Sequence, residues 1–427
     1  MKTNMEAKDV EKNTGMSRRE MLTTIGAVGA GLAAGSVLPG EAAAQEAAAQ
    51  EAGTQATPGD TFQMKTVIAQ PALFYYPGEV LAADEIRVSV MGSGWGNSFR
   101  RRQATCSLFI ELGNGDSYVW DLGLGSMINY NTMQVPYSRM TKVFLTHLHA
   151  DHTTDVVPLY CFGPAVDRYT PLRIWGPSGD RPDLGVKYMM ETGLKAYSNW
   201  HVTSFMTVVP GSSETTGGYG LKVTELDYRK SGGIAYQENG VTIKHWPALH
   251  TINGAIGYRL EWNGMSVVWS GDSNPSHFFV ENNKQGADLM FHETAPIPDR
   301  MVAAGVPKQL AAAIVNSSHT SPRALGKIFA LTKPSLGVTI HSAVDPQEVS
   351  TYLDEVRVHW KGAYQLVAED LMVFNISKGK KTITVRQAAV NDRAWGVKVA
   401  HTSETKAPLP ASEYRSATLW SNEIKDY

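Results

Sequence analysis

The sequence has almost no net charge and very little cysteine. Its 427 residues carry 39 Lys and Arg against 41 Asp and Glu, so no basic field draws the chain to a nucleic-acid backbone. The two cysteines, Cys106 and Cys161, exclude a disulfide framework and a cysteine-rich metal site, and the sequence leaves open whether they pair. A hydrophobic content of 43% is that of an ordinary globular protein, with room for one large domain or two.

The N-terminal region has the pattern of an export signal. Ser17-Arg18-Arg19 leads into a mildly apolar, Gly- and Ala-rich run from Met21 to Leu38, and Ala42-Ala43-Ala44 offers a small-residue cleavage site. Residues 1–44 thus resemble a twin-arginine (Tat) signal, which implies the Tat export machinery as a partner and a periplasmic or secreted location. An uncleaved transmembrane anchor is the alternative. Residues 45–64, rich in Ala, Gln and Glu, predict a flexible linker.

The densest group of metal-ligand side chains comes directly after a predicted strand. Val143, Phe144 and Leu145 form a short apolar run that suits a buried strand. The four candidate ligands that follow it are His147, His149, Asp151 and His152. Imidazole and carboxylate groups bind zinc and related divalent ions, and strand-end loops are where a scaffold holds functional side chains. The alternative, a solvated polar loop, gives no reason for three His and one Asp so close together.

This stretch resembles the His-x-His-x-Asp-His signature of the metallo-β-lactamase-fold hydrolases. That family has three later ligands at strand ends: a His, an Asp after a Gly, and a last His. His250 follows the strand-like Val241–Lys244, Asp272 follows Gly271 after a strand-like run, and His341 ends another such run. The resemblance implies that one metal ion is held by His147, His149 and His250, a second by Asp151, His152 and His341, and that Asp272 bridges them.

Two further motifs resemble those of the ribonuclease Z, arylsulfatase and cyclic phosphodiesterase branch. They are His292-Glu293-Thr294 and His319-Thr320-Ser321. Carried over, His319 is expected to be an acid or electrostatic donor near the metals, oriented by Glu293, while Asp151 also steers the nucleophile. The alternative is a structural hydrogen-bond pair between a strand and a helix start. His292 is expected to face away from Glu293 along the strand.

The resemblance implies an α/β fold, the αββα metallo-β-lactamase-type sandwich, in a hydrolase domain over residues 65–385. Residues 386–427 are a C-terminal extension without an assigned role. Helices are expected after the Ser321-Pro322 and Asp345-Pro346 caps, and from about residue 184 to 198 behind an Asp183 cap. The rest of the span from Arg181 to Gly233 is expected to be irregular and to form a lid or substrate wall.

The function implied is that of an exported dinuclear hydrolase with two divalent ions, zinc first and manganese or iron as alternatives. A hydroxide shared by the two ions would cleave a sulfate ester or phosphodiester of a small molecule. A lactonase or other carboxylic ester hydrolase is the alternative, and a non-catalytic metal-binding protein is the third reading.

Two properties of the chain argue against a nucleic-acid substrate. The net charge is −2, and His250 and Asp272 are too close in sequence for the flexible arm that ribonuclease Z carries between those ligands. The oligomeric state stays open, and a homodimer is compatible with the sequence.

Overall fold

The computed structural model describes residues 66–390, apart from 97–99, 207–208, 210, 296–297, 304 and 362–363. The predicted export signal, the linker and residues 391–427 of the predicted extension lie outside this range. Within the described part of the chain, no helix is both long and apolar enough to cross a bilayer.

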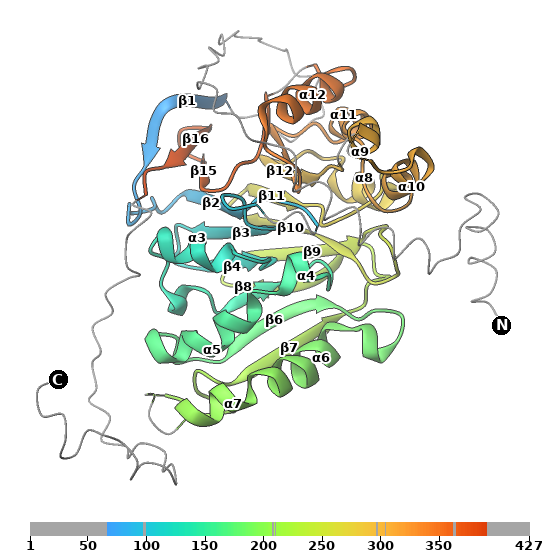
Figure 1. Ribbon diagram of the computed structural model, residues 1–427. Helices are drawn as coiled ribbons and strands as arrows, with labels where there is room; N and C mark the ends of the chain where they lie inside the picture. The colour runs from blue at the N-terminus through green and yellow to red at the C-terminus, as the bar shows by residue number, and fades with distance from the viewer. Residues whose placement is uncertain are drawn as a thin grey trace, which may run out of the picture.

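Two mixed β-sheets pack face to face, with helices on both outer sides (Figure 1). In the described residues the order of strands in the first sheet is β1 (Thr66–Tyr75), β16 (Thr382–Ala388), β15 (Met372–Ser377), β2 (Glu85–Gly92), β3 (Ser107–Leu112), β4 (Ser117–Trp120), β5 (Lys142–Phe144), β6 (Leu172–Pro177) and β7 (Leu221–Leu226). The order in the second is β14 (Tyr364–Val367), β13 (Leu336–Ile340), β12 (Leu289–Glu293), β11 (Met265–Trp269), β10 (Ile256–Trp262), β9 (Val241–Pro247) and β8 (Gly233–Glu238).

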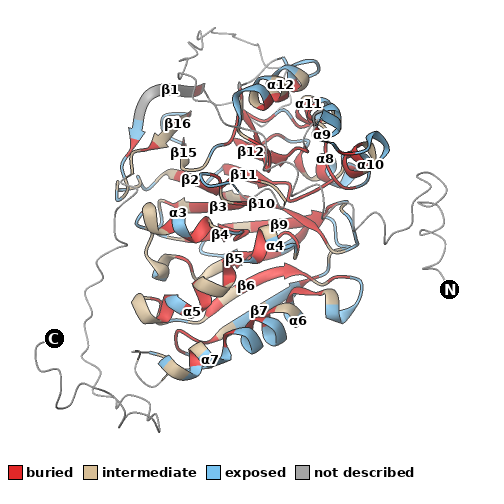
Figure 2. Ribbon diagram, viewed as in Figure 1, coloured by how far each residue is buried: buried red, intermediate tan, exposed pale blue. Residues whose placement is uncertain are grey.

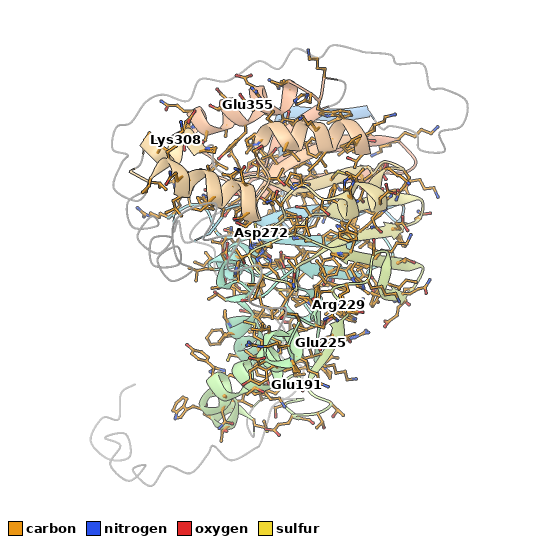
Figure 3. The ribbon with its side chains drawn as sticks, turned by 90° about the vertical axis from the view of Figure 1, so that its right-hand side faces the viewer. Glu191, Glu225, Arg229, Asp272, Lys308 and Glu355 are labelled. Carbon is orange, nitrogen blue, oxygen red and sulfur yellow. The ribbon has the colours of Figure 1, made fainter. Side chains whose placement is uncertain are left out.

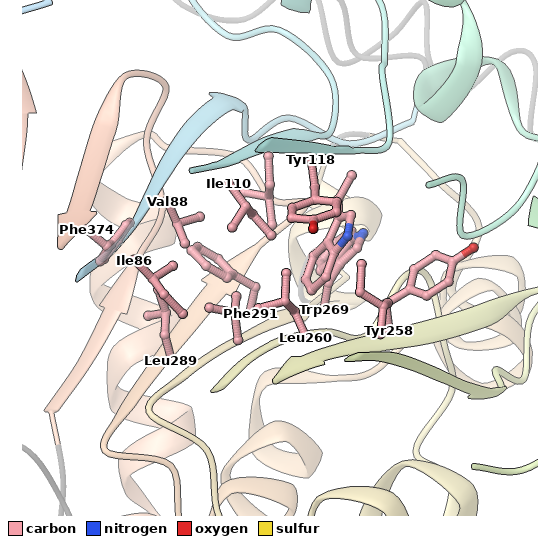
Figure 4. Packing of buried hydrophobic residues seen from close by; sticks show 14 of the residues in the cluster. Ile86, Val88, Ile110, Tyr118, Tyr258, Leu260, Trp269, Leu289, Phe291 and Phe374 are labelled. Atoms are coloured by element: carbon pink, nitrogen blue, oxygen red, sulfur yellow. The ribbon is translucent and has the colours of Figure 1, made fainter. Parts of the chain in front are cut away.

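The core between the sheets is built by side chains that alternate along the strands. Ile86 and Val88 of β2 share one buried cluster with Leu260 of β10 and Phe291 of β12 (Figure 4). Figure 2 shows that most of the central strands are buried. Full burial of one such side chain stabilises the fold by roughly 1.5–3 kcal/mol.

Each sheet also has an apolar outer face that helices cover. Helices α3 (Ser126–Thr132), α5 (Val156–Val166) and α7 (Lys195–Phe205) contribute to a cluster with Phe109 and Val143 of the first sheet. Helices α8 (His277–Asn283), α11 (Pro322–Thr332) and α12 (Pro346–Arg357) contribute to a cluster with Val268 and Met290 of the second. Two more helices, α9 (Pro298–Ala303) and α10 (Lys308–Ser318), pack on each other beside the second sheet. This layering confirms the predicted αββα sandwich.

Two predicted helix starts are confirmed by their capping hydrogen bonds. Ser321 accepts the backbone N–H of Ala324 at the start of α11, and Asp345 accepts that of Glu348 at the start of α12. A proline follows each cap at the first helical position, where its missing N–H costs nothing.

The predicted Asp183 cap is wrong. Pro182 starts a short 3₁₀ turn, η3 (Pro182–Leu184), in which the Asp183 carboxylate turns back to the Arg181 guanidinium at 2.7 and 3.0 Å. The helical segment begins after Gly185 with α6 (Val186–Tyr188) and continues through the π-helical η4 (Met189–Leu194) into α7.

The predicted helix from about residue 184 to 198 is confirmed, and it extends to Phe205. The prediction that the rest of the span to residue 233 is irregular is wrong at β7. The segment contains η3, α6, η4 and α7 and the edge strand β7, because Val186, Met190, Leu194 and Val202 bury one side against the first sheet. At the other end of the domain, β16 runs to Ala388, past the predicted boundary at residue 385, and pairs in parallel with β1. Cys106 and Cys161 are both buried and unpaired.

Candidate metal centre

The candidate ligands lie where strands of both sheets end. His147 and His149 follow β5, and His152 lies in the short helix α4 (Ala150–Thr153). His250, Asp272 and His341 follow β9, β11 and β13. Since β11, β12 and β13 run parallel, their carboxyl ends share one edge. Asp272 lies near the middle of the side view in Figure 3, where the two halves of the sandwich meet.

Three histidine nitrogens converge on one point. His149 Nδ1 lies 3.1 Å from His147 Nε2 and 3.1 Å from His250 Nε2. One imidazole nitrogen has either one proton or one lone pair, so it cannot serve two hydrogen bonds in different directions. Nitrogens bound tetrahedrally to zinc at 2.0–2.1 Å are about 3.3 Å apart, close to the spacing seen here. The three rings therefore fit one divalent ion.

A second group of donors lies next to the first. His341 Nε2 lies 3.3 Å from Asp151 Oδ2, and His152 Nε2 lies 3.6 Å from the same oxygen. Asp272 faces both groups: its Oδ2 is 3.2 Å from His341 Nε2 and 3.7 Å from His147 Nε2, and its Oδ1 is 3.3 Å from His152 Nε2. The structure thus brings all seven predicted ligands together, with Asp272 between the two groups.

The donor set fits cations. His152 Nε2 and Asp272 Oδ1 are buried without a hydrogen-bond partner, although buried polar atoms are normally paired. Burial lowers the pKa of His147, and it lowers the pKa of His250 to about 3, so that both rings are neutral and offer lone pairs near pH 7. Burial opposes ionisation of Asp272, but the rings of His341, His152 and His147 hold its pKa well below the usual range. Burial lowers the pKa of His152, but the charges of Asp272, Asp151 and Asp121 outweigh it and raise that pKa well above the usual value, so a cation bound there would take the place of a proton. Ionised Asp272 beside the neutral rings of His147 and His250 is a donor set that suits a divalent ion.

Asp121 orients the second group, and sequence reasoning missed this role. Its Oδ2 lies 2.9 Å from His152 Nδ1 and accepts hydrogen bonds from Trp269 Nε1 and Thr146 Oγ1 at 2.8 Å each. Its Oδ1 accepts the Thr146 backbone N–H at 2.7 Å. The signal available in the sequence was its place directly after the apolar and aromatic run Tyr118-Val119-Trp120.

The other imidazole nitrogen of His250, Nδ1, also has a hydrogen-bond partner that orients the ring. His250 Nδ1 lies 2.8 Å from the Ser318 carbonyl oxygen, at the end of α10, so it donates its proton there and turns Nε2 toward His149. A backbone carbonyl or carboxylate behind a ligand histidine sets the tautomer that binds metal.

A Gly-rich loop after β2 contacts the second group of candidate ligands. The Gly96 backbone N–H donates to Asp151 Oδ2 at 2.8 Å. Asp370, which sequence reasoning also missed, holds this loop by accepting from Ser93 N and Oγ at 2.9 and 2.7 Å and from Ala104 N at 2.7 Å. The carboxylate of Asp370 therefore fixes the loop that contacts a metal-ligand candidate.

Cys106 lies beside the second group but is a poor ligand. Its sulfur is within 4.8 Å of ring nitrogens of His152 and His341. Burial raises the pKa of its thiol well above the usual value, and the charge of Asp272 raises it further. A metal binds the thiolate, so this thiol is a protonated neighbour of the site.

The structure brings His319 and Glu293 together at the edge of the cluster. His319 Nδ1 lies 3.4 Å from Glu293 Oε1, and the His319 ring centroid lies 5.0 Å from that of His250 and 5.7 Å from that of His341. Burial by itself lowers the pKa of His319, but the charge of Glu293 outweighs it and raises that pKa to about 9. The ring is therefore a cation at neutral pH and faces the ligand cluster.

Glu293 is itself held firmly, whereas His292 faces elsewhere. Glu293 is fully buried, and its Oε1 accepts the backbone N–H groups of Ser273 and Thr320 at 3.1 and 3.0 Å. His292 points to the outer layer, where its ring meets Phe279 edge-on at 4.7 Å, as expected of a structural residue.

Comparisons with known proteins identify relatives of the chain. Residues 132–342 match the family model described as "Beta-lactamase superfamily domain". Ribonuclease BN from Proteus mirabilis is 25% identical over 225 residues, which are 52% of this chain and 64% of that protein. Ribonuclease Z from Ignicoccus hospitalis is 22% identical over 309 residues, or 67% of this chain and 96% of that one.

The solved structures show the same fold. The metallo-β-lactamase fold protein YhfI from Bacillus subtilis has a TM-score of 0.50 at 18% identity, covering 68% of this chain and 99% of that one. The chain thus has the metallo-β-lactamase fold, with ribonuclease Z and BN homologues at low identity.

Proposed function

We propose that this protein is an exported dinuclear metal-dependent hydrolase that cleaves a sulfate ester or phosphodiester of a small molecule. The observation that carries the proposal is the convergence of seven His and Asp side chains on two adjacent points, with Asp272 between them. None of the seven positions has lost its ligand, which argues against a non-catalytic protein on the same fold.

The chain offers two subsites for the ions. His147, His149 and His250 would hold one ion, and Asp151, His152 and His341 the other, with Asp272 shared. The His-rich donor set favours zinc and also suits manganese or iron. Divalent ions bound there would lower the pKa of a water molecule and polarise an ester oxygen.

The side chains around the subsites supply orientation and a proton. Glu293 faces His319 Nδ1, which leaves His319 Nε2 as the nitrogen for a substrate oxygen. At neutral pH this ring can hold an anionic ester oxygen or pass its Nε2 proton to the leaving oxygen. Asp151 Oδ2, which accepts the Gly96 backbone N–H, would orient the attacking water.

A small substrate is favoured over RNA by the chain between His250 and Asp272. In the described structure this connection is only the β10–β11 hairpin with its short flanking loops, so it carries no arm that could reach along a polymer. The net charge of −2 also offers no general attraction to a polyanion.

The proposal is tested by hydrolysis assays on the purified, zinc-loaded protein. p-Nitrophenyl sulfate, bis-p-nitrophenyl phosphate and an acyl-homoserine lactone are compared side by side, with Asp272→Ala as the matched control. We expect turnover of the sulfate or the diester, and its loss in the variant. Turnover of the lactone alone would replace the proposal by a carboxylic ester hydrolase, and no turnover of any ester with two zinc ions bound would refute it.

Export is proposed from the Ser17-Arg18-Arg19 pattern and needs a separate test. Arg18→Lys combined with Arg19→Lys should keep the protein in the cytoplasmic fraction, whereas the unaltered chain should appear in the periplasm or the medium. Equal distribution of both forms would refute Tat export.

A further inference from the structure

A cavity of about 260 Å³ opens beside the first metal subsite. One wall is formed by the end of β6, η3 and the start of η4, and the other by the loop from His250 to Ala255. The two walls meet: a Cβ on Gly254, whose φ is +131°, would lie 3.2 Å from Gly179 Cα. His147, His149 and His250 form its floor, so whatever fills the cavity lies against the metal ligands.

Most of the lining surface of this cavity is apolar. The apolar residues of the first wall are Pro177, Leu184 and Met189. Ile252 comes from the second wall, and Leu148 from the loop after β5. Such a lining stabilises an uncharged, apolar group by removing its surface from water. The volume is just below the roughly 300–1,000 Å³ of drug-sized sites, which suits one ring or a short chain.

The polar part of the lining carries no free positive charge. Among the described residues that line the cavity none is Lys or Arg, and the acidic Asp183 stands at the rim. The nearby Arg181 is paired with Asp183 through two hydrogen bonds of 3.0 and 2.7 Å. A phosphate-rich substituent would need cationic partners that this lining does not provide.

We propose that this cavity is the specificity pocket of the site and takes an uncharged, apolar, ring-sized substituent of the ester, with Leu184, Met189 and Ile252 as its specificity-determining residues. The inference rests on the proposed function, and it narrows the substrate to an aryl or short alkyl ester whose single anionic centre lies at the metal subsites. The Arg181–Asp183 pair keeps the rim neutral and so gives no advantage to a charged ring.

The test uses binding rather than turnover. Calorimetry on the zinc-loaded protein compares methylphosphonate, phenylphosphonate and 4-phosphonobenzoate, which share the metal-binding group and differ only in the substituent. We expect phenylphosphonate to bind about tenfold more tightly than methylphosphonate, because its ring enters the pocket. It should also bind more tightly than 4-phosphonobenzoate, whose carboxylate would meet an apolar wall.

Variants test whether the preference for an aromatic ring comes from the residues that line the cavity. Ile252 is 49% exposed on a loop, so Ile252→Ala should fold normally and weaken phenylphosphonate several-fold without changing methylphosphonate. Leu331→Ala, at an exposed α11 position outside the cavity, is the matched control. Asp183→Asn should free Arg181 and strengthen 4-phosphonobenzoate about fivefold, as expected of one partly screened charge.

The outcomes separate this inference from the proposed function. Equal binding of the three phosphonates, or Ile252→Ala indistinguishable from Leu331→Ala, would overturn the pocket even if the protein hydrolyses esters. Tighter binding of phenylphosphonate that is lost in Ile252→Ala would support the pocket, even if the protein hydrolyses none of the esters tested. In that case only the proposed function would be refuted.

Discussion

The Nδ1 atom of His152 lies 2.9 Å from Asp121 Oδ2, and neither side chain has any exposed surface. This contact fixes the ring so that Nε2 points to Asp272 and Asp151. The second proposed metal subsite is therefore oriented by a carboxylate outside the proposed ligand set.

Asp121→Asn is expected to weaken zinc binding at the second subsite by roughly 10–100-fold, as is usual for groups behind a ligand histidine. The amide can accept fewer hydrogen bonds, and its NH₂ group would face the donors of Thr146 and Trp269. Zinc affinity is measured by chelator competition. Asp167→Asn, which alters a surface carboxylate that accepts from Ser138, is the control. Unchanged affinity in Asp121→Asn would contradict the assigned role.

Asp272→Ala is expected to reduce zinc binding at both subsites and to abolish hydrolysis. Its Oδ2 is the atom that faces His147 and His250 on one side and His341 on the other. By contrast, His147→Ala removes a donor from the first subsite only and should retain about one ion per chain. Zinc content is measured by elemental analysis. Two ions per chain with full turnover in Asp272→Ala would rule out the shared position.

His319→Ala is expected to retain both zinc ions and to slow hydrolysis by roughly 10²–10⁴-fold, the range of acid–base residues. The loss should be larger for an ester with a poor leaving group than for a p-nitrophenyl ester, because a poor leaving group needs the Nε2 proton more. His277→Ala, at an exposed position of α8, is the control. An equal loss for good and poor leaving groups would leave His319 with electrostatic binding alone.

His245 is expected to make stability fall in mild acid. His245 lies in β9, which pairs with β8 on one side and β10 on the other, and its exposed fraction is 2%. Its Nδ1 has no hydrogen-bond partner, and burial lowers its pKa to about 4. The unfolded chain, with a His pKa near 6.5, binds more protons between pH 6.5 and 4. The free energy of unfolding therefore has its full value above about pH 6.5 and falls as the pH is lowered, by up to about 3 kcal/mol from this group.

His245→Gln should flatten this pH dependence relative to the unaltered protein, whereas His359→Gln, on the surface after α12, should not. Urea unfolding at pH 7.0 and 5.0, with the same zinc loading, gives the comparison. Parallel pH profiles for His245→Gln and the unaltered protein would show that His245 is not responsible.

Patterns between neighbouring residues were enough to predict the ligand positions, two helix caps and the fold. The four candidate ligands within the six residues from His147 to His152, the Gly before Asp272 and the strand before His341 are patterns between sequence neighbours. The same holds for the Ser321 and Asp345 caps, since a capping side chain bonds a backbone N–H three residues away. The αββα fold followed from the resemblance carried by those motifs, and the two packed sheets confirm it.

Only the tertiary structure decided the contacts between distant segments. Asp121 meets Trp269, and Asp370 meets Ser93, across more than a hundred residues of chain, and no periodicity in the sequence marks such a pair. The pairing of β1 with β16, the addition of β7 to the edge of the first sheet and the cavity between η3 and the His250–Ala255 loop have the same origin. Each of these depends on which buried surfaces meet when the sheets pack, because burial and hydrogen bonding are satisfied between elements and not within them.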